Sequence, residues 1–150
     1  MHRNRSRATT RRARDLAALA LAALLALAAV AAPMALAGGS KTVVGEAKAP
    51  SLHKTVLTNT KGLTLYALSA EKNGRFICTG SCTNTWFPLL VARGTTPKGP
   101  VRLGTVKRPE GKIQVTFKGL PLYTFDGDRA KGQAKGEGFK DVGTWHAVTP

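Results

Sequence analysis

The sequence predicts a small all-β domain with antiparallel strand pairing, and three observations lead to this fold class. Residues 113–117 (Ile-Gln-Val-Thr-Phe) alternate apolar and polar side chains, which is the pattern of a half-buried strand. Turn sequences rich in Gly and Pro flank this run, and no stretch after residue 37 shows convincing helical periodicity. The third observation is an internal repeat, in which each copy contains a predicted hairpin.

The first 37 residues have the pattern of a secretory signal peptide. Six Arg and one acidic residue lie within residues 1–15, and residues 16–32 contain only Ala, Leu and Val. Ala35-Leu36-Ala37 follows, and its small side chains suit a signal peptidase. We expect cleavage after Ala37 and export to the cell envelope or the medium, with no transmembrane segment left. A retained anchor is the alternative, because 17 apolar residues lie near the lower limit for crossing a bilayer.

The export route stays open between the general secretory and the twin-arginine pathways. Arg11-Arg12 is the pair that suggests the second route, but the polar residues after the pair do not fit its usual pattern. No Cys stands at the predicted cleavage site, so a lipid-modified N-terminus is not expected.

Cleavage would leave residues 38–150, which we divide into a flexible linker (38–52) and a two-copy β domain (53–150). Six of the 23 basic residues and one of the eight acidic residues precede residue 38, so the remainder carries a net charge of +10. For an exported protein, this charge favours anionic cell-wall polymers or lipid headgroups as partners, and not nucleic acid. The alternative is that the charge serves only solubility. We expect a monomer.

Turn sequences set the predicted strand order in the second half. Arg108-Pro109-Glu110-Gly111 is a turn sequence, so residues 101–106 are expected to pair with residues 113–117. Lys118-Gly119 then forms a two-residue hairpin connection to residues 120–125. Residues 127–143, with five Gly, are predicted to form a loop.

The internal repeat relates residues 61–68 to residues 118–125. Lys-Gly-Leu-Thr-Leu-Tyr-Ala-Leu in the first copy corresponds to Lys-Gly-Leu-Pro-Leu-Tyr-Thr-Phe in the second. The residues that match across the copies are Tyr66 and Tyr123, Leu68 and Phe125, Glu71 and Asp128, and Trp86 and Trp145. The copies span about 55–92 and 113–150, with a connector over 93–112. We expect the two hairpins to bury Leu65, Leu68, Leu122, Phe125 and both Trp between them, and each Tyr to bond the acid of its own copy.

Residues 123–128 (Tyr-Thr-Phe-Asp-Gly-Asp) resemble the motif Tyr-x-(Phe/Trp/Tyr)-x-x-Asp of a secreted-repeat family of bacterial lipoproteins of unknown function. The first copy departs from the motif, with Leu68 in the aromatic place and Glu71 in the acidic place. Residues 78–82, 86–89 and 143–146 also resemble that family. The resemblance implies a secreted or envelope-attached domain of two copies, and it implies no established activity.

Cys78 and Cys82 are the only cysteines, and export places them in an oxidising compartment. We predict a structural disulfide that fixes the first loop. A redox-active dithiol is the alternative, and it needs a nearby positive charge, for which Arg75 is the only candidate near in sequence. The spacing fits neither a zinc pair nor a haem attachment.

No catalytic constellation emerges from the sequence, so we expect a non-enzymatic protein without a cofactor or metal. Asp126-Gly127-Asp128 is followed by Arg129, Ala130 and Lys131, which cannot line a calcium loop with oxygen atoms. The Gly-rich residues 132–138 lack the Lys-Ser/Thr ending of a phosphate loop. His53 and His146 suggest no nucleophile–base pair. The function expected is an envelope protein that binds anionic surfaces, and the alternative is an extracytoplasmic redox or electron-transfer protein.

Overall fold

The structure is a computed structural model that describes residues 38–150. The predicted signal peptide (1–37) lies outside the described residues. Within residues 38–150, none of the helical segments has the length and apolar character needed to cross a bilayer.

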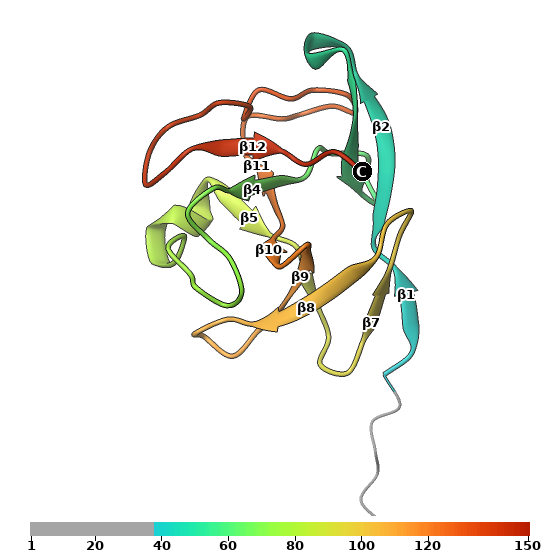
Figure 1. The fold of residues 1–150 in the computed structure, drawn as a ribbon, viewed down its shortest axis with the longest axis vertical. Helices are drawn as coiled ribbons and strands as arrows, with labels where there is room; N and C mark the ends of the chain where they lie inside the picture. Colours follow the sequence, from blue (N-terminus) through green and yellow to red (C-terminus); the bar gives the residue numbers. More distant parts are fainter. Residues whose placement is uncertain (1–37) are drawn as a thin grey trace, which may run out of the picture. The chain divides into compact units, whose positions relative to one another are not determined.

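The fold is all-β, as predicted, and its regular segments are short (Figure 1). The strands are β1 (Ser40–Thr42), β2 (Val44–Ala49), β3 (Lys54–Asn59), β4 (Tyr66–Leu68), β5 (Trp86–Pro88), β6 (Leu90–Val91), β7 (Thr96–Lys98), β8 (Leu103–Lys107), β9 (Ile113–Phe117), β10 (Leu120–Pro121), β11 (Tyr123–Phe125) and β12 (Trp145–Ala147). Two 3₁₀ turns, η1 (Pro50–Leu52) and η2 (Gly80–Asn84), complete the regular structure.

Four sheets form from these strands. The central sheet has the order β12-β4-β11-β5 and is antiparallel throughout. In the second sheet, β9 pairs with β8, β10 and β6, again antiparallel. A two-stranded antiparallel sheet joins β2 to β3, and β1 pairs with β7 in parallel. The short β1–β7 pair is the exception to the antiparallel pairing that the sequence predicts.

The pairings predicted for residues 101–125 are confirmed. β8 pairs with β9 from Leu103↔Phe117 to Lys107↔Ile113, across the turn in which Gly111 has a φ of +86°. β9 and β10 form the expected hairpin, with Phe117 opposite Leu120. Lys118 and Gly119 have φ values of +52° and +80°, which is the conformation that a two-residue hairpin loop requires. Residues 127–143 contain no strand, in agreement with the predicted loop.

The flexible linker expected over residues 38–52 is wrong, because these residues hold β1, β2 and η1. All six residues of β2 pair with β3, from Val44↔Asn59 to Ala49↔Lys54. Val43, Val44 and Ala49 are buried, and they pack into the core. Small and charged residues hide this strand in the sequence, since Glu46 and Lys48 lie between its two apolar ends.

Three hydrophobic clusters form within residues 38–150, and the apolar residues expected to be buried together fall into two of them. Leu65 and Leu122 belong to the first cluster, together with Leu57, Val115 and Phe117. Leu68 and the two Trp belong to the second cluster, which also contains both Tyr and Cys78. Alternation along a strand explains the division, because neighbouring residues point to opposite faces of a sheet.

Candidate functional site

The central sheet brings the two predicted copies together at their Tyr residues. Tyr66 of β4 lies directly opposite Tyr123 of β11. Each of these strands also pairs with the Trp strand of the other copy, so that Leu68 lies opposite Trp145 and Phe125 lies opposite Trp86. Residues that match in the sequence repeat therefore occupy matching places in the sheet. The two segments are interleaved, and neither completes the central sheet alone.

Aromatic rings fill the space on one face of this sheet. The ring centroids of Trp86 and Trp145 are 3.8 Å apart and their planes differ by 8°, so the two indoles stack. Tyr66 meets Trp86 edge-on at 5.5 Å, and Tyr123 meets Trp145 edge-on at 5.1 Å. Phe125 lies 4.5 Å from Trp86 between ring centroids. Such contacts stabilise a core beyond the area they bury.

Asp141 joins the two indoles through its carboxylate, a role that the sequence analysis missed. Its Oδ1 accepts a hydrogen bond from the Nε1 of Trp145 at 2.9 Å, and its Oδ2 accepts one from the Nε1 of Trp86 at 3.2 Å. Asp141 lies in the long Gly-rich loop, where no sequence pattern separates it from an ordinary solvated acid. One carboxylate therefore satisfies the only polar atom of both buried rings.

Each Tyr hydroxyl bonds the acid of the other copy, and not the acid of its own copy as expected. Tyr66 donates to Oδ2 of Asp128 at 2.6 Å, and Tyr123 donates to Oε2 of Glu71 at 2.8 Å. The interleaving explains the correction, because β4 and β11 run antiparallel and each Tyr faces the loop that follows the other strand. These bonds tie the two predicted copies together.

The two acids also close their own loops by accepting bonds from backbone N–H groups. Oε1 of Glu71 accepts from the amides of Ile77 and Cys78, both at 2.6 Å. Oδ1 of Asp128 accepts from the amide of Lys135 at 3.0 Å. Cys78 and Lys135 lie at the same distance along the chain from their respective acids, so the two loops are closed in the same way.

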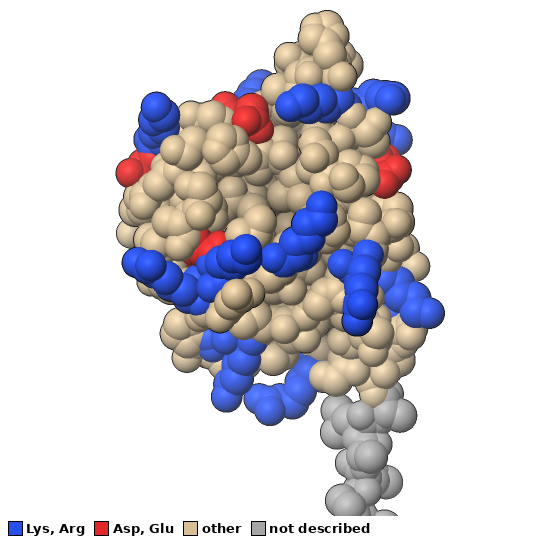
Figure 2. Space-filling model, viewed as in Figure 1, with Lys and Arg blue, Asp and Glu red and all other residues tan. Residues whose placement is uncertain are grey.

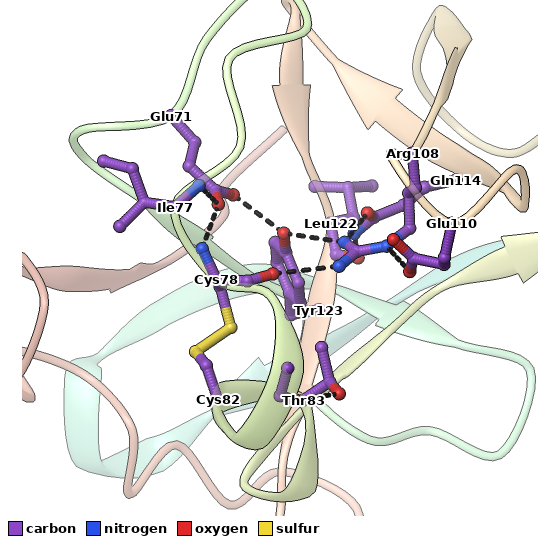
Figure 3. Close-up of polar contacts among 11 residues, drawn as sticks. Glu71, Ile77, Cys78, Cys82, Thr83, Arg108, Glu110, Gln114, Leu122 and Tyr123 are labelled. Atoms are coloured by element: carbon purple, nitrogen blue, oxygen red, sulfur yellow. Dashed lines mark hydrogen bonds and ion pairs between the residues drawn. A yellow bond between two sulfur atoms is a disulfide. The ribbon is translucent and has the colours of Figure 1, made fainter.

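Arg108 completes the network on the Tyr123 side, and the sequence analysis treated it only as a turn residue (Figure 3). Its guanidinium is buried, with 1 % of the residue exposed. It donates to Oε1 of Gln114 at 2.6 Å, to the hydroxyl of Tyr123 at 3.1 Å and to the carbonyl of Cys78 at 2.9 Å. An ion pair with Glu110 uses its remaining face. Arg75, the cation expected near the cysteines, is exposed.

Burial and charge shift the ionisation of these groups. Burial is the main cause that raises the pKa of Tyr66 and of Tyr123, and the neighbouring carboxylates of Asp128 and Glu71 add to the shift. Burial alone would lower the pKa of Arg108, but its bonds to Glu110 and Tyr123 outweigh burial and raise that pKa. The pKa of Glu110 is lowered, since the bond to Arg108 outweighs its slight burial. The network therefore keeps both Tyr neutral and Arg108 charged.

The predicted disulfide between Cys78 and Cys82 is confirmed. Their Cα atoms are 5.2 Å apart, and the bridge closes over the 3₁₀ turn η2. Cys78 is buried, and its backbone is held from both sides, by Glu71 at the amide and by Arg108 at the carbonyl. The backbone of Cys78 therefore connects the disulfide to the buried hydrogen-bond network.

The remaining candidate residues do not join this site. His146 is exposed on β12, where its Nδ1 lies 2.9 Å from Oε1 of Glu137, and His53 takes a φ of +52° in the turn after η1. Within residues 38–150, no group of three or more His, Cys, Asp or Glu is placed to hold a metal ion. The motif residues are thus gathered into one buried cluster whose chemistry is to hold loops and rings in place.

One family model matches the C-terminal third of the chain. Residues 104–149, from β8 to β12, match the model of a family described as a secreted repeat of unknown function. The chain has no significant match among curated proteins or solved structures. The matched family agrees with the secreted-repeat family that the sequence resembles, and its description supports an extracytoplasmic location. Residues 104–149 are therefore similar to a secreted repeat of unknown function.

Proposed function

We propose that this chain is a secreted, non-enzymatic protein whose two related copies form one rigid domain that binds anionic surfaces of the cell envelope. The observation that carries the proposal is the uneven placement of charge. Among residues 38–150, all Lys and Arg are exposed except Arg108. Two of the seven acids in this range, Glu71 and Asp128, are buried in the network and contribute little to the surface.

Six of the sixteen exposed basic residues within residues 38–150 lie in residues 90–120, which we call the basic segment. This segment holds six exposed basic residues and a single acid, Glu110, which pairs with Arg108. Residues 121–150, in contrast, hold four basic and four acidic residues. Figure 2 shows Lys and Arg side chains across the lower half of the displayed face, around β7 and β8, and further ones along its upper edge. The six basic residues are Arg93, Lys98, Arg102, Lys107, Lys112 and Lys118.

The shared chemistry of the proposed partners is a dense array of phosphate or carboxylate groups. Wall polymers and anionic lipid headgroups both present such arrays, and each basic residue near an anionic surface contributes about 1 kcal/mol of attraction. Within residues 38–150, Arg108 and Arg129 are the only Lys or Arg residues that form an ion pair, so the charge of the other basic residues is available to a partner.

The test compares two variants that lose the same charge at different places. The segment variant carries Lys98→Gln, Arg102→Gln, Lys107→Gln and Lys112→Gln. The control variant carries Lys54→Gln, Lys131→Gln, Lys135→Gln and Lys140→Gln, all at exposed positions outside the segment. Co-sedimentation with phosphatidylglycerol vesicles and with phosphate-bearing wall polymer separates the two sources of negative charge.

We expect the unmodified protein to bind at least one of these partners at low ionic strength and to be released as salt screens the attraction. The segment variant should lose most of the binding, and the control variant should keep most of it. Absence of binding at low ionic strength, or equal loss in both variants, would contradict the proposal.

A redox or electron-transfer role for Cys78 and Cys82 is the alternative. Two observations favour it: Cys82 is only half-buried, and the Arg108 guanidinium donates to the Cys78 carbonyl. Burial of Cys78 opposes it, because reactive cysteines are at least partly exposed whereas buried structural ones are inert. The reduction potential decides between the roles, since a structural disulfide lies below about −300 mV.

A further inference from the structure

We propose that an apolar hollow lined by residues of β4, β9, β10 and β12 holds one alkyl chain of an anionic lipid, with the headgroup at Lys118. The hollow has a volume of about 230 Å³, and its floor is apolar. Ala67, Phe117, Leu120 and Val148 supply that floor. The volume is below the roughly 300–1,000 Å³ of a drug-sized site, so it suits a single chain. This inference rests on the proposed binding of anionic surfaces.

The hairpin turn between β9 and β10 places a cation at one end of the hollow. Lys118 is exposed, and its Nζ lies 4.6 Å from the centroid of the Phe117 ring, which lines the hollow. A second basic residue comes from the loop that contacts this turn. The amide of Asn73 donates to the carbonyl of Gly119 at 2.9 Å, and the exposed Lys72 immediately precedes Asn73. A negatively charged headgroup is therefore attracted to this end.

An acidic residue contacts another lining residue of the hollow. His146 also lines the hollow, and its Nδ1 lies 2.9 Å from Oε1 of Glu137. Oε2 of Glu137 accepts a hydrogen bond from the amide of Ala147 at 2.6 Å, which fixes the carboxylate beside the hollow. An anionic headgroup is attracted by Lys118 and repelled by Glu137, which favours a headgroup position at Lys118.

The charge pattern also favours this ligand over other occupants. A wholly apolar partner would leave the Lys118 ammonium without a counter-charge, and a plain anion would leave the floor of Phe117 and Leu120 in water. A ligand with one alkyl chain and one phosphate satisfies both requirements. The basic segment supplies the longer-range attraction that brings such a lipid to the protein.

The experiment measures binding of soluble, monomeric probes by NMR titration of the purified protein. The probes are octyl phosphate, butyl phosphate, octyl glucoside and inorganic phosphate. We expect octyl phosphate to bind at least tenfold more tightly than each of the others, with shifts at Ala67, Leu120 and Val148. Equal binding of butyl and octyl phosphate would overturn the inference, because the apolar floor would then contribute nothing.

Two single variants separate the headgroup site from general charge. Lys118→Gln should weaken octyl phosphate about fivefold and leave octyl glucoside unchanged, as expected for one basic residue near an anion. Lys140→Gln removes the same charge at an exposed position outside both the basic segment and the hollow, and it should leave both affinities unchanged. Equal loss in the two variants would overturn the inference.

The remaining outcomes are also decisive. A concentration-dependent dimer that octyl phosphate dissociates would assign the hollow to a second copy of the chain and overturn the inference. Binding to vesicles together with equal affinities for butyl and octyl phosphate would support the proposed function and overturn only the inference that the hollow binds an alkyl chain. Tight binding of octyl phosphate without any association with vesicles or wall polymer would support alkyl-chain binding in the hollow and contradict the proposed function.

Discussion

Replacing Tyr123 by Phe removes one hydroxyl that connects two buried charged groups. The hydroxyl donates to Glu71 at 2.8 Å and accepts from Arg108 at 3.1 Å, and these two residues are 0 % and 1 % exposed. The ring itself keeps its place against Trp145 in the variant. The substitution therefore tests the hydrogen bonds and leaves the packing almost unchanged.

The expected cost follows from what each partner retains. A hydrogen bond to a charged group contributes about 1.5–3 kcal/mol, and a buried group left without a partner costs more. Glu71 keeps two backbone N–H donors, and Arg108 keeps Gln114 and the Cys78 carbonyl, so neither charge becomes isolated. We expect Tyr123→Phe to lower the free energy of unfolding by about 2–4 kcal/mol in total.

Tyr66→Phe is the matched control, because Tyr66 bonds one buried charge where Tyr123 bonds two. Its hydroxyl donates to Asp128 at 2.6 Å and accepts only a long bond from the Gly136 amide at 3.3 Å. We expect a loss of about 1.5–3 kcal/mol, smaller than for Tyr123→Phe.

Urea unfolding measures both losses as a lower midpoint with an unchanged slope. A double-mutant cycle between Tyr123→Phe and Glu71→Gln should give a coupling of at least about 0.5 kcal/mol. A loss below about 0.5 kcal/mol for Tyr123→Phe, the size of an ordinary surface change, would refute the role assigned to the network.

Three further predictions concern pH, the indole pair and the disulfide. Both Tyr have a raised pKa in the folded protein, so the unfolded chain releases their protons first. The contribution of the two Tyr to stability should therefore be constant below about pH 10 and fall above it by up to about 1.4 kcal/mol per pH unit for each Tyr. Tyrosinate absorbance from folded protein near pH 10 would contradict this. Asp141→Asn leaves one carbonyl oxygen for two indoles, so unfolding should become easier by about 1–2 kcal/mol, with one indole N–H resonance shifted and the other retained. Replacing Cys78 and Cys82 together by Ala should cost about 2 kcal/mol, as expected for a loop of roughly five residues, and an unchanged urea midpoint would rule this out.

The sequence was sufficient for the features that depend on local patterns. Alternation in residues 113–117 and the turn chemistry of Gly111, Lys118 and Gly119 predicted the pairing of β8, β9 and β10. The spacing of Cys78 and Cys82 in an exported chain predicted the disulfide. The repeat predicted that Leu68 and both Trp would be buried together, and they lie in one cluster. It paired each Tyr with the acid of its own copy, which the hydrogen bonds contradict.

The features that depend on which strands become neighbours could not be predicted. The interleaved order of the central sheet decides that Tyr66 bonds Asp128 and Tyr123 bonds Glu71, and no local pattern encodes that order. Arg108 looked like a surface turn residue because its partners come from distant parts of the chain. β2 was missed since its pairing with β3 and its buried ends, and not its own composition, make it a strand.

The most direct test of the proposed function is the affinity for phosphatidylglycerol vesicles and for phosphate-bearing wall polymer, measured at low ionic strength for the segment and control variants. At about 1 kcal/mol for each basic residue near an anionic surface, four substitutions in the basic segment should weaken binding by up to about 4 kcal/mol, a factor of roughly 1,000. The control variant, with the same net charge, should lose less than about tenfold in affinity. Equal losses in the two variants would mean that only net charge matters and would contradict the account of a basic segment.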